Sequence, residues 1–129
     1  ASGWALAAAA TGGKGSSSNR SASIILESSI IKNDNNFESL LASESSLGKA
    51  GIEINDSKIT DTQSHILVSA YSGKESDVQF KNTTVTGNQV SSILVSNAFN
   101  PGASDNAIID ITESTISENI IKYNGIVTS

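Results

Sequence analysis

The sequence predicts an all-β protein in which short strands stack in parallel coils, a β-solenoid of about four to five coils with three strands in each. Two observations lead to this prediction. Small polar and β-branched residues dominate the composition, and an eleven-residue pattern recurs four times at offsets of 28, 26 and 31 residues. We expect a single solenoid domain over residues 1–129, either a fragment or an assembling subunit of a longer fibre.

The composition favours strands and turns over helices. The chain holds 24 Ser, 12 Asn and 9 Thr, together with 10 Gly and a single Pro, whereas helical domains are rich in Leu, Glu, Lys and Ala. The 16 Ile residues indicate the same class, because β-branched side chains fit a pleated surface.

Charge and missing residue types disfavour several functions. A net charge of −5 with 8 Lys and Arg argues against a nucleic-acid partner, which needs a basic surface. The lack of Cys excludes disulfides and thiolate chemistry, and a single His disfavours a His-based metal site or proton relay. No apolar run approaches ~20 residues, so we expect no membrane span. The apolar start Ala1–Ala10 lacks an initiating Met and a basic segment, and we interpret it as part of the mature chain.

The repeat aligns without gaps and shares apolar residues at positions one, three and eight, with Ser or Thr at position six. We expect each apolar position to form a column that stacks in the core from coil to coil. The four copies are Ile24–Asp34, Ile52–Thr62, Val78–Asn88 and Ile109–Asn119. The three columns are Ile24/Ile52/Val78/Ile109, Leu26/Ile54/Phe80/Ile111 and Ile31/Ile59/Val85/Ile116.

A corner divides each copy. Positions three and eight lie an odd number of residues apart, so in one straight strand their side chains would point to opposite faces. A bend between them lets both point inward, and the residues there are turn formers. The predicted bends are Ser28-Ser29, Asp56-Ser57, Asn82-Thr83 and Glu113-Ser114.

A further strand accompanies each copy, and a polar loop of variable length leads from it into the next copy. Because the copies differ in length mainly in these loops, we expect the loops to lie on the outside. We expect Thr11–Ser21 and Ala98–Asn106 to project outward and to make any partner contacts. The strands are predicted at Ala5–Ala10, Ser39–Glu44, His65–Ala70, Ser92–Asn97 and Asn124–Ser129. The loops are predicted at Thr11–Ser21, Ser45–Ala50, Tyr71–Ser76 and Ala98–Asn106.

This coil periodicity and corner chemistry resemble the right-handed parallel β-helix of pectin-lyase-like proteins and of autotransporter passenger domains. The resemblance covers nearly the whole chain and identifies an architecture, with the individual family left open. It implies three parallel sheets around an apolar core, with successive coils about 4.8 Å apart. A β-sandwich with coincidental internal similarity is the alternative.

The corner carboxylates are the first candidates for chemistry. A catalytic interpretation would pair Asp56 with Glu113, two coils or about 10 Å apart, which is close to the carboxyl separation of inverting glycosidases. Satisfying backbone groups is the structural interpretation of the same column, and we favour it. The column consists of Ser28, Asp56, Asn82 and Glu113.

Metal-dependent chemistry has weaker candidates. Polysaccharide lyases of this fold need acidic residues that bind calcium and a basic residue that removes a proton, and the only Arg, Arg20, has no pair of Asp residues beside it. Glu53 and Asp110 share an outward column with Gln79 and could contact a divalent cation. A solvated strand face explains these residues equally well, so we assign no catalytic, cofactor-binding or metal-binding residue.

Pairs of Thr and Ser flank the position-eight residues. They resemble the ice-binding surfaces of some antifreeze proteins, but two of the four coils carry Lys or Ile in their place, and strand propensity alone accounts for exposed Thr. The pairs are Thr84 with Thr86 and Thr115 with Ser117, and the interruptions are Lys58 with Thr60 and Ile30 with Lys32.

The remaining singular residues have structural interpretations. His65 opens a predicted strand, and Trp4 is expected to cover the first coil. Three N-x-[ST] sequons occur, about the number that 12 Asn residues produce by chance. They lie at Asn19, Asn55 and Asn82.

Two hypotheses for function follow. The first is a non-catalytic extracellular β-helix module, a segment of a surface fibre, stalk or adhesin, which associates end to end or belongs to a larger parent chain. The second is a carbohydrate-active β-helix, that is, a polysaccharide lyase, a hydrolase or a phage tailspike fragment; an ice-binding solenoid is a lesser alternative. Absent Cys and Met and a Ser/Thr/Asn surface favour secretion, and a carbohydrate or cell-surface ligand is compatible with either hypothesis.

Overall fold

The computed structural model describes residues 4–10, 21–32, 36–45, 48–98 and 106–128, which form 13 β-strands and no helix. Sheet A contains β1 (Trp4–Ala10), β4 (Asn36–Ser45), β7 (Gln63–Ser72), β10 (Gln89–Ala98) and β13 (Ile120–Thr128). Sheet B contains β2 (Ala22–Glu27), β5 (Lys49–Asn55), β8 (Glu75–Lys81) and β11 (Asn106–Thr112). Sheet C contains β3 (Ile30–Lys32), β6 (Lys58–Thr60), β9 (Thr84–Thr86) and β12 (Thr115–Ser117).

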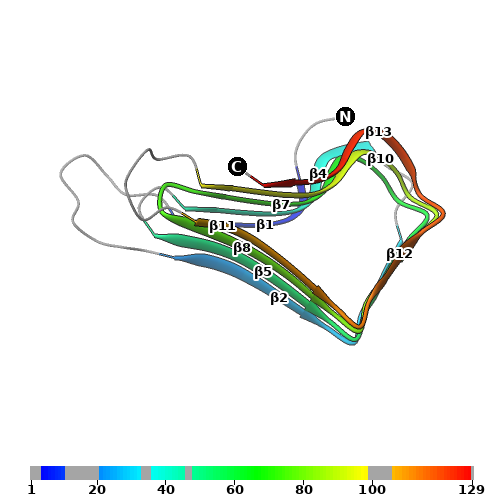
Figure 1. The fold of residues 1–129 in the computed structure, drawn as a ribbon, viewed down its shortest axis with the longest axis horizontal. Coiled ribbons are helices and arrows are strands. Elements are labelled where there is room, and N and C mark those ends of the chain that lie inside the picture. Colours follow the sequence, from blue (N-terminus) through cyan, green and yellow to red (C-terminus); the bar gives the residue numbers. More distant parts are fainter. Residues whose placement is uncertain (1–3, 11–20, 33–35, 46–47, 99–105, 129) are drawn as a thin grey trace.

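The molecule is a parallel β-solenoid. Every strand pairs in parallel with the strand one coil away, which confirms the predicted fold and excludes a sandwich of antiparallel sheets. Figure 1 looks down the stack: sheets A and B run close together on one side, and sheet C closes the other. The stack makes about 3 turns, slightly fewer than the four to five coils predicted, since four strands in a column enclose only three intervals.

The predicted core columns are confirmed in register. Ile31 pairs with Ile59, Ile59 with Val85, and Val85 with Ile116, and the other two columns align in the same way in sheet B. Ile59 and Val85 are 0 % exposed. The burial of β5 and β8 alternates along the strand, as expected for strands with one face in the core.

The narrow side of the solenoid is filled by hydroxyl and methyl groups. Where sheets A and B converge (Figure 1), Ala50, Ala70, Ser76 and Ser96 are fully buried. The Ser76 and Ser96 hydroxyls lie 2.7 Å apart and bridge the two sheets. Small side chains are required here because two sheets that approach this closely leave no room for Ile or Leu.

Two of the loops are shorter than predicted. β7 runs to Ser72 and β8 begins at Glu75, so the connection predicted over Tyr71–Ser76 contains only Gly73 and Lys74. The Ser72 hydroxyl accepts hydrogen bonds from the N–H groups of Lys74 and Glu75, each 2.8 Å long. The connection predicted over Ser45–Ala50 likewise overlaps β4 and β5 at its two ends. The loops predicted at Thr11–Ser21 and Ala98–Asn106 lie outside the described residues except at their ends.

The strands of sheet A are longer than predicted. The segment predicted as His65–Ala70 is the middle of the ten-residue strand β7, and β4 and β10 extend similarly. β13 differs from the others because its pairing with β10 shifts by one residue between Val90 and Ser92. This shift is a β-bulge, in which Lys122 and Tyr123 together lie opposite Ser91.

Candidate functional site

The first corner is a stack of strained backbone positions. Ser28, Asp56, Asn82 and Glu113 have φ angles of 48°, 51°, 47° and 49°, the left-handed region that disfavours most L-residues. The predicted bends therefore occur in all four copies. The Asn82 amide donates to Asp56 Oδ1 at 2.9 Å, so the structure places an amide between the carboxylates of Asp56 and Glu113 and engages one of them in the corner.

Hydroxyl groups at the next position tie each coil to its neighbour. Ser29 N–H donates to Ser57 Oγ at 3.1 Å, and Thr83 N–H donates to Ser114 Oγ at 3.0 Å. The hydroxyls also donate to the carbonyl two residues earlier, for example from Ser57 to Asn55 at 2.7 Å. The side chains of the predicted Ser/Thr column are therefore engaged in structural hydrogen bonds.

A second corner was missed by sequence reasoning. Asp61, Gly87 and Glu118 have φ angles of 49°, 71° and 56°, and the residue that follows each one points into the stack. Asn88 is fully buried, accepts from Thr62 N–H at 2.9 Å and donates to the carbonyl of Ile59 at 3.1 Å. Asn119 repeats this pattern one coil later. The available signal was Asn at the eleventh repeat position of two copies.

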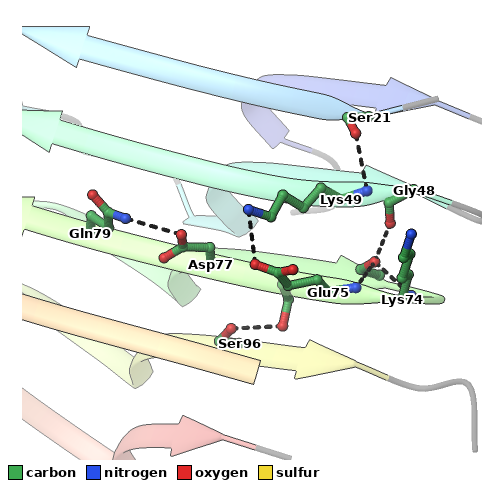
Figure 2. Close-up of polar contacts among 10 residues, drawn as sticks. Ser21, Gly48, Lys49, Lys74, Glu75, Asp77, Gln79 and Ser96 are labelled. Carbon is green, nitrogen blue, oxygen red and sulfur yellow. Dashed lines mark hydrogen bonds and ion pairs between the residues drawn. The ribbon is translucent and has the colours of Figure 1, made fainter. Parts of the chain in front are cut away.

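The outward face of sheet B carries several charged side chains near one another. The register confirms the predicted column, because Glu53 pairs with Gln79 and Gln79 with Asp110. Figure 2 shows Lys49 reaching Glu75 on the next strand, with a separation of 2.9 Å between Nζ and Oε1. Glu75, by hydrogen bond and by charge, raises the pKa of Lys49 above its ordinary value.

A shallow hollow of about 140 Å³ lies on this face above Gly51. Asp77 lines it, and the Gln79 amide donates to Asp77 Oδ2 at 3.0 Å (Figure 2). Asp77 Oδ1 is the one buried side-chain oxygen without a hydrogen-bond partner in the described part of the chain. Ile25, 61 % exposed, forms an apolar wall. The described residues contain no group of three acidic, His or Cys side chains that could hold a metal ion.

Sheet C presents the predicted Thr pairs in register. Thr84 pairs with Thr115, and Thr86 pairs with Ser117. The adjacent coil places Lys58 beside Thr84, so the interruption expected from the sequence is real. Beyond it, Lys32 forms a 3.4 Å ion pair with Asp61.

The other predicted residues are dispersed. His65 is exposed on β7, where its Nδ1 lies 3.1 Å from Ser91 Oγ. Trp4 lies in β1 opposite Ser39, and its side chain is outside the described part of the chain. Asn19 and Arg20 also lie outside the described residues.

In sheet A, burial raises the pKa of the Tyr71 hydroxyl, and the nearby carboxylates of Glu44 and Glu38 add to the shift.

In the described ranges of the chain, no helix is long and apolar enough to cross a membrane. No family model, curated protein or solved structure matches this sequence.

Proposed function

We propose that the chain is a non-catalytic structural and adhesive β-solenoid module of an extracellular fibre or stalk, joined end to end with other solenoids. The observation that carries the proposal is the use of the polar corner residues. Their hydroxyl and amide groups bond one coil to the next, an arrangement suited to a rigid rod. A surface rich in Ser, Thr and Asn, without Cys or Met, supports an extracellular place.

The exposed apolar residues of the coil that contains β11 and β13 support the end-to-end contact. Val90, Leu94 and Phe80 are at most 2 % exposed. Their counterparts one coil later, Ile121, Ile126 and Ile111, are 39 %, 51 % and 36 % exposed. Three neighbouring core columns therefore meet solvent at β11 and β13. Burial of apolar surface there would favour association by about 25 cal/mol per Å².

The register defines how a second copy would fit. Leu6 pairs with Leu41 at one edge of sheet A, and Leu94 pairs with Ile126 at the other. Addition of β1 to β13 of another copy would therefore bring Leu6 beside Ile126 and continue sheet A in parallel.

Strand numbers limit this joint. Sheet A has five strands, whereas sheets B and C have four each, so addition of β1 to β13 would leave both other sheets interrupted by one strand. Suppose instead that β2 of one copy pairs with β11 of another copy, and β3 with β12. Then β1 of the first copy and β13 of the second copy would occupy the same position in sheet A. A joint continuous in all three sheets requires β1 to leave sheet A.

Sedimentation velocity and negative-stain microscopy of the 129-residue chain test the proposal. We expect mass to grow with concentration through head-to-tail contacts, which form open rods. Ile126→Lys should abolish this growth, whereas Thr128→Lys, on an exposed residue of the same strand, should reduce it less. A wild-type chain that stays monomeric at millimolar concentration would contradict the end-to-end contact.

The hollow above Gly51 favours carbohydrate binding as a second candidate function. Gln79 and Glu53 offer hydrogen-bond acceptors, while Ile25 supplies an apolar surface on which a sugar ring could lie. Gly51→Val tests this function, because the added Cβ meets nothing closer than 4.0 Å and the side chain would occupy the hollow. The variant should fold normally and lose saccharide binding in a calorimetric titration with neutral oligosaccharides.

A further inference from the structure

A second surface pocket lies between β7, β10 and β13 and has a volume of about 260 Å³. Its polar lining comes from six residues, Gln63, Ser64, His65, Gln89, Ser91 and Lys122. The register explains why these residues meet. Gln63 and Gln89 are paired neighbours, His65 and Ser91 lie two residues further along the same strands, and Lys122 comes from the third strand.

The β-bulge in β13 lies beside the pocket, and Lys122 follows the register of Gln89 with Ile120 and of Val90 with Ile121. In the pairing of β7 with β10 no register shift occurs, and a single residue, Ser91, lies opposite His65. In β13 an extra residue is accommodated, so both Lys122 and Tyr123 lie opposite Ser91. Lys122 lines the pocket, while Tyr123 is 76 % exposed.

The pocket is rich in hydrogen-bond donors. His65 Nδ1 and Ser91 Oγ are 3.1 Å apart, and either neutral tautomer leaves one donor free. If Nδ1 accepts from the Ser91 hydroxyl, Nε2–H is free; if Nδ1–H donates, the hydroxyl proton is free. The two Gln amides add N–H groups, and Lys122 adds a positive charge.

Negative charges lie outside the pocket. No carboxylate lines it, although the chain has 13 acidic against 8 basic residues. The nearest acidic residue along the row is Glu38, which the pairing of β4 with β7 places beside His65 on the side away from Ser91. Glu118 lies at the corner that precedes β13. No carboxylate in the lining therefore competes with an anion for Lys122 or for the donors of His65 and Ser91.

We propose that this pocket binds one small oxyanion, a carboxylate or a sulfate group, with Lys122 as its counter-charge and His65, Ser91 and the two Gln residues as hydrogen-bond donors. Charge-assisted hydrogen bonds are the strongest available to an exposed site. A cation is disfavoured by Lys122, and an apolar ligand finds only Val90 in the lining.

Nuclear magnetic resonance of the 129-residue chain tests the proposal directly, because His65 is the only His and its imidazole signals identify themselves. The chain is titrated at about pH 7 with sodium sulfate and separately with sodium acetate, each against sodium chloride of equal ionic strength. We expect a saturable shift of the imidazole signals with sulfate or acetate, and the tighter of the two identifies the preferred group. Chloride should give only a small linear drift.

Two variants separate binding from general charge effects. Lys122→Gln should weaken binding by about fivefold, the upper range for one exposed charge contact, and Lys122→Arg should restore it. Lys81→Gln removes an exposed charge on the distant sheet B and should leave the titration unchanged. The absence of a saturable shift, or equal affinity in the Lys122→Gln variant, would overturn the proposal.

Discussion

The side-chain amide of Asn88 donates to Oδ1 of Asn119, the equivalent residue one coil later, at 2.9 Å. The same Oδ1 accepts the backbone N–H of Asn88 at 3.0 Å. The side-chain carbonyl of Asn119 thus accepts two hydrogen bonds from the preceding coil. One coil earlier, the side-chain carbonyl of Asn88 accepts the backbone N–H of Thr62 in the same way. At the second corner these side-chain bonds supplement the backbone hydrogen bonds between neighbouring coils, such as that from Gln89 N–H to the carbonyl of Thr62.

Asn88→Ala should destabilise the solenoid by about 3 kcal/mol, because the buried N–H of Thr62 and carbonyl of Ile59 each lose a partner. Denaturation by urea, followed by circular dichroism, gives the free energy of unfolding. Asn119→Ala provides the comparison: it lies in a coil with more solvent access and should cost less. Equal losses in the two variants would argue against a burial-dependent role.

Ile59→Asp should prevent folding. Ile59 is 0 % exposed between Ile31 and Val85, and an unpaired carboxylate there costs more than about 4 kcal/mol. Lys58→Asp, on the exposed face of the same strand, is the matched control and should fold. The far-ultraviolet circular dichroism spectrum distinguishes the outcomes, and a folded Ile59→Asp variant would contradict the core assignment.

Stability should fall in alkaline solution through Tyr71. Its pKa is raised above the ordinary value of 10.0 by burial and by Glu44 and Glu38, so the folded state holds the proton more tightly than the unfolded state. This contribution is complete below the unfolded pKa and is lost as the pH rises through the folded pKa. The pKa of Lys49 is also raised in the folded state, so its contribution to stability is likewise lost as the pH rises.

The melting temperature should therefore drop as the pH rises above about 10. The drop should be smaller in Tyr71→Phe, since Phe has no hydroxyl to ionise. Tyr123→Phe, at a residue that is 76 % exposed, should behave as the wild type. A Tyr71→Phe profile identical to that of the wild type would assign the alkaline loss to other groups.

Removal of residues 1–10 should promote end-to-end assembly. The deletion takes β1 out of sheet A and leaves four strands in each of the three sheets, so that a joint can continue all three. β1 contributes little apolar burial, since Leu6 is 44 % exposed and Ala7 and Ala9 are also exposed. Sedimentation velocity should show larger species at lower concentration than for the full chain. A variant that assembles less well would indicate that β1 itself makes the joint.

The three core columns could be predicted because the alternation of side chains along a strand is fixed by backbone geometry. Ile54 and Ile59, five residues apart, already require the bend that Asp56 makes. The second corner could not be found in this way, because Asp61, Gly87 and Glu118 share a backbone conformation and no side-chain type. Ser76 was assigned to a loop because Ser usually marks turns, whereas here its hydroxyl bonds with Ser96 across the narrow interior.

The pocket beside Lys122 was beyond sequence reasoning for a different reason. A bulge depends on how β13 aligns with β10, and nothing in the local sequence around Tyr123 specifies that alignment. The hollow above Gly51 depends in turn on three strands that are distant in the sequence. Glu53, Gln79 and Asp110 were correctly aligned from the repeat, but the unpartnered oxygen of Asp77 appears only once the neighbouring side chains are placed.

The hydroxyl ladder of the first corner has a consequence for how the protein opens. Each bond, such as that from Ser29 N–H to Ser57 Oγ, links only adjacent coils, so cooperativity extends along the stack one neighbour at a time, as in a zipper. Opening should start at the outermost coil and advance inward, and amide protons should exchange fastest in β12 and β13 and slowest in β6 and β9. A rod of this kind yields gradually from its ends while its centre stays intact.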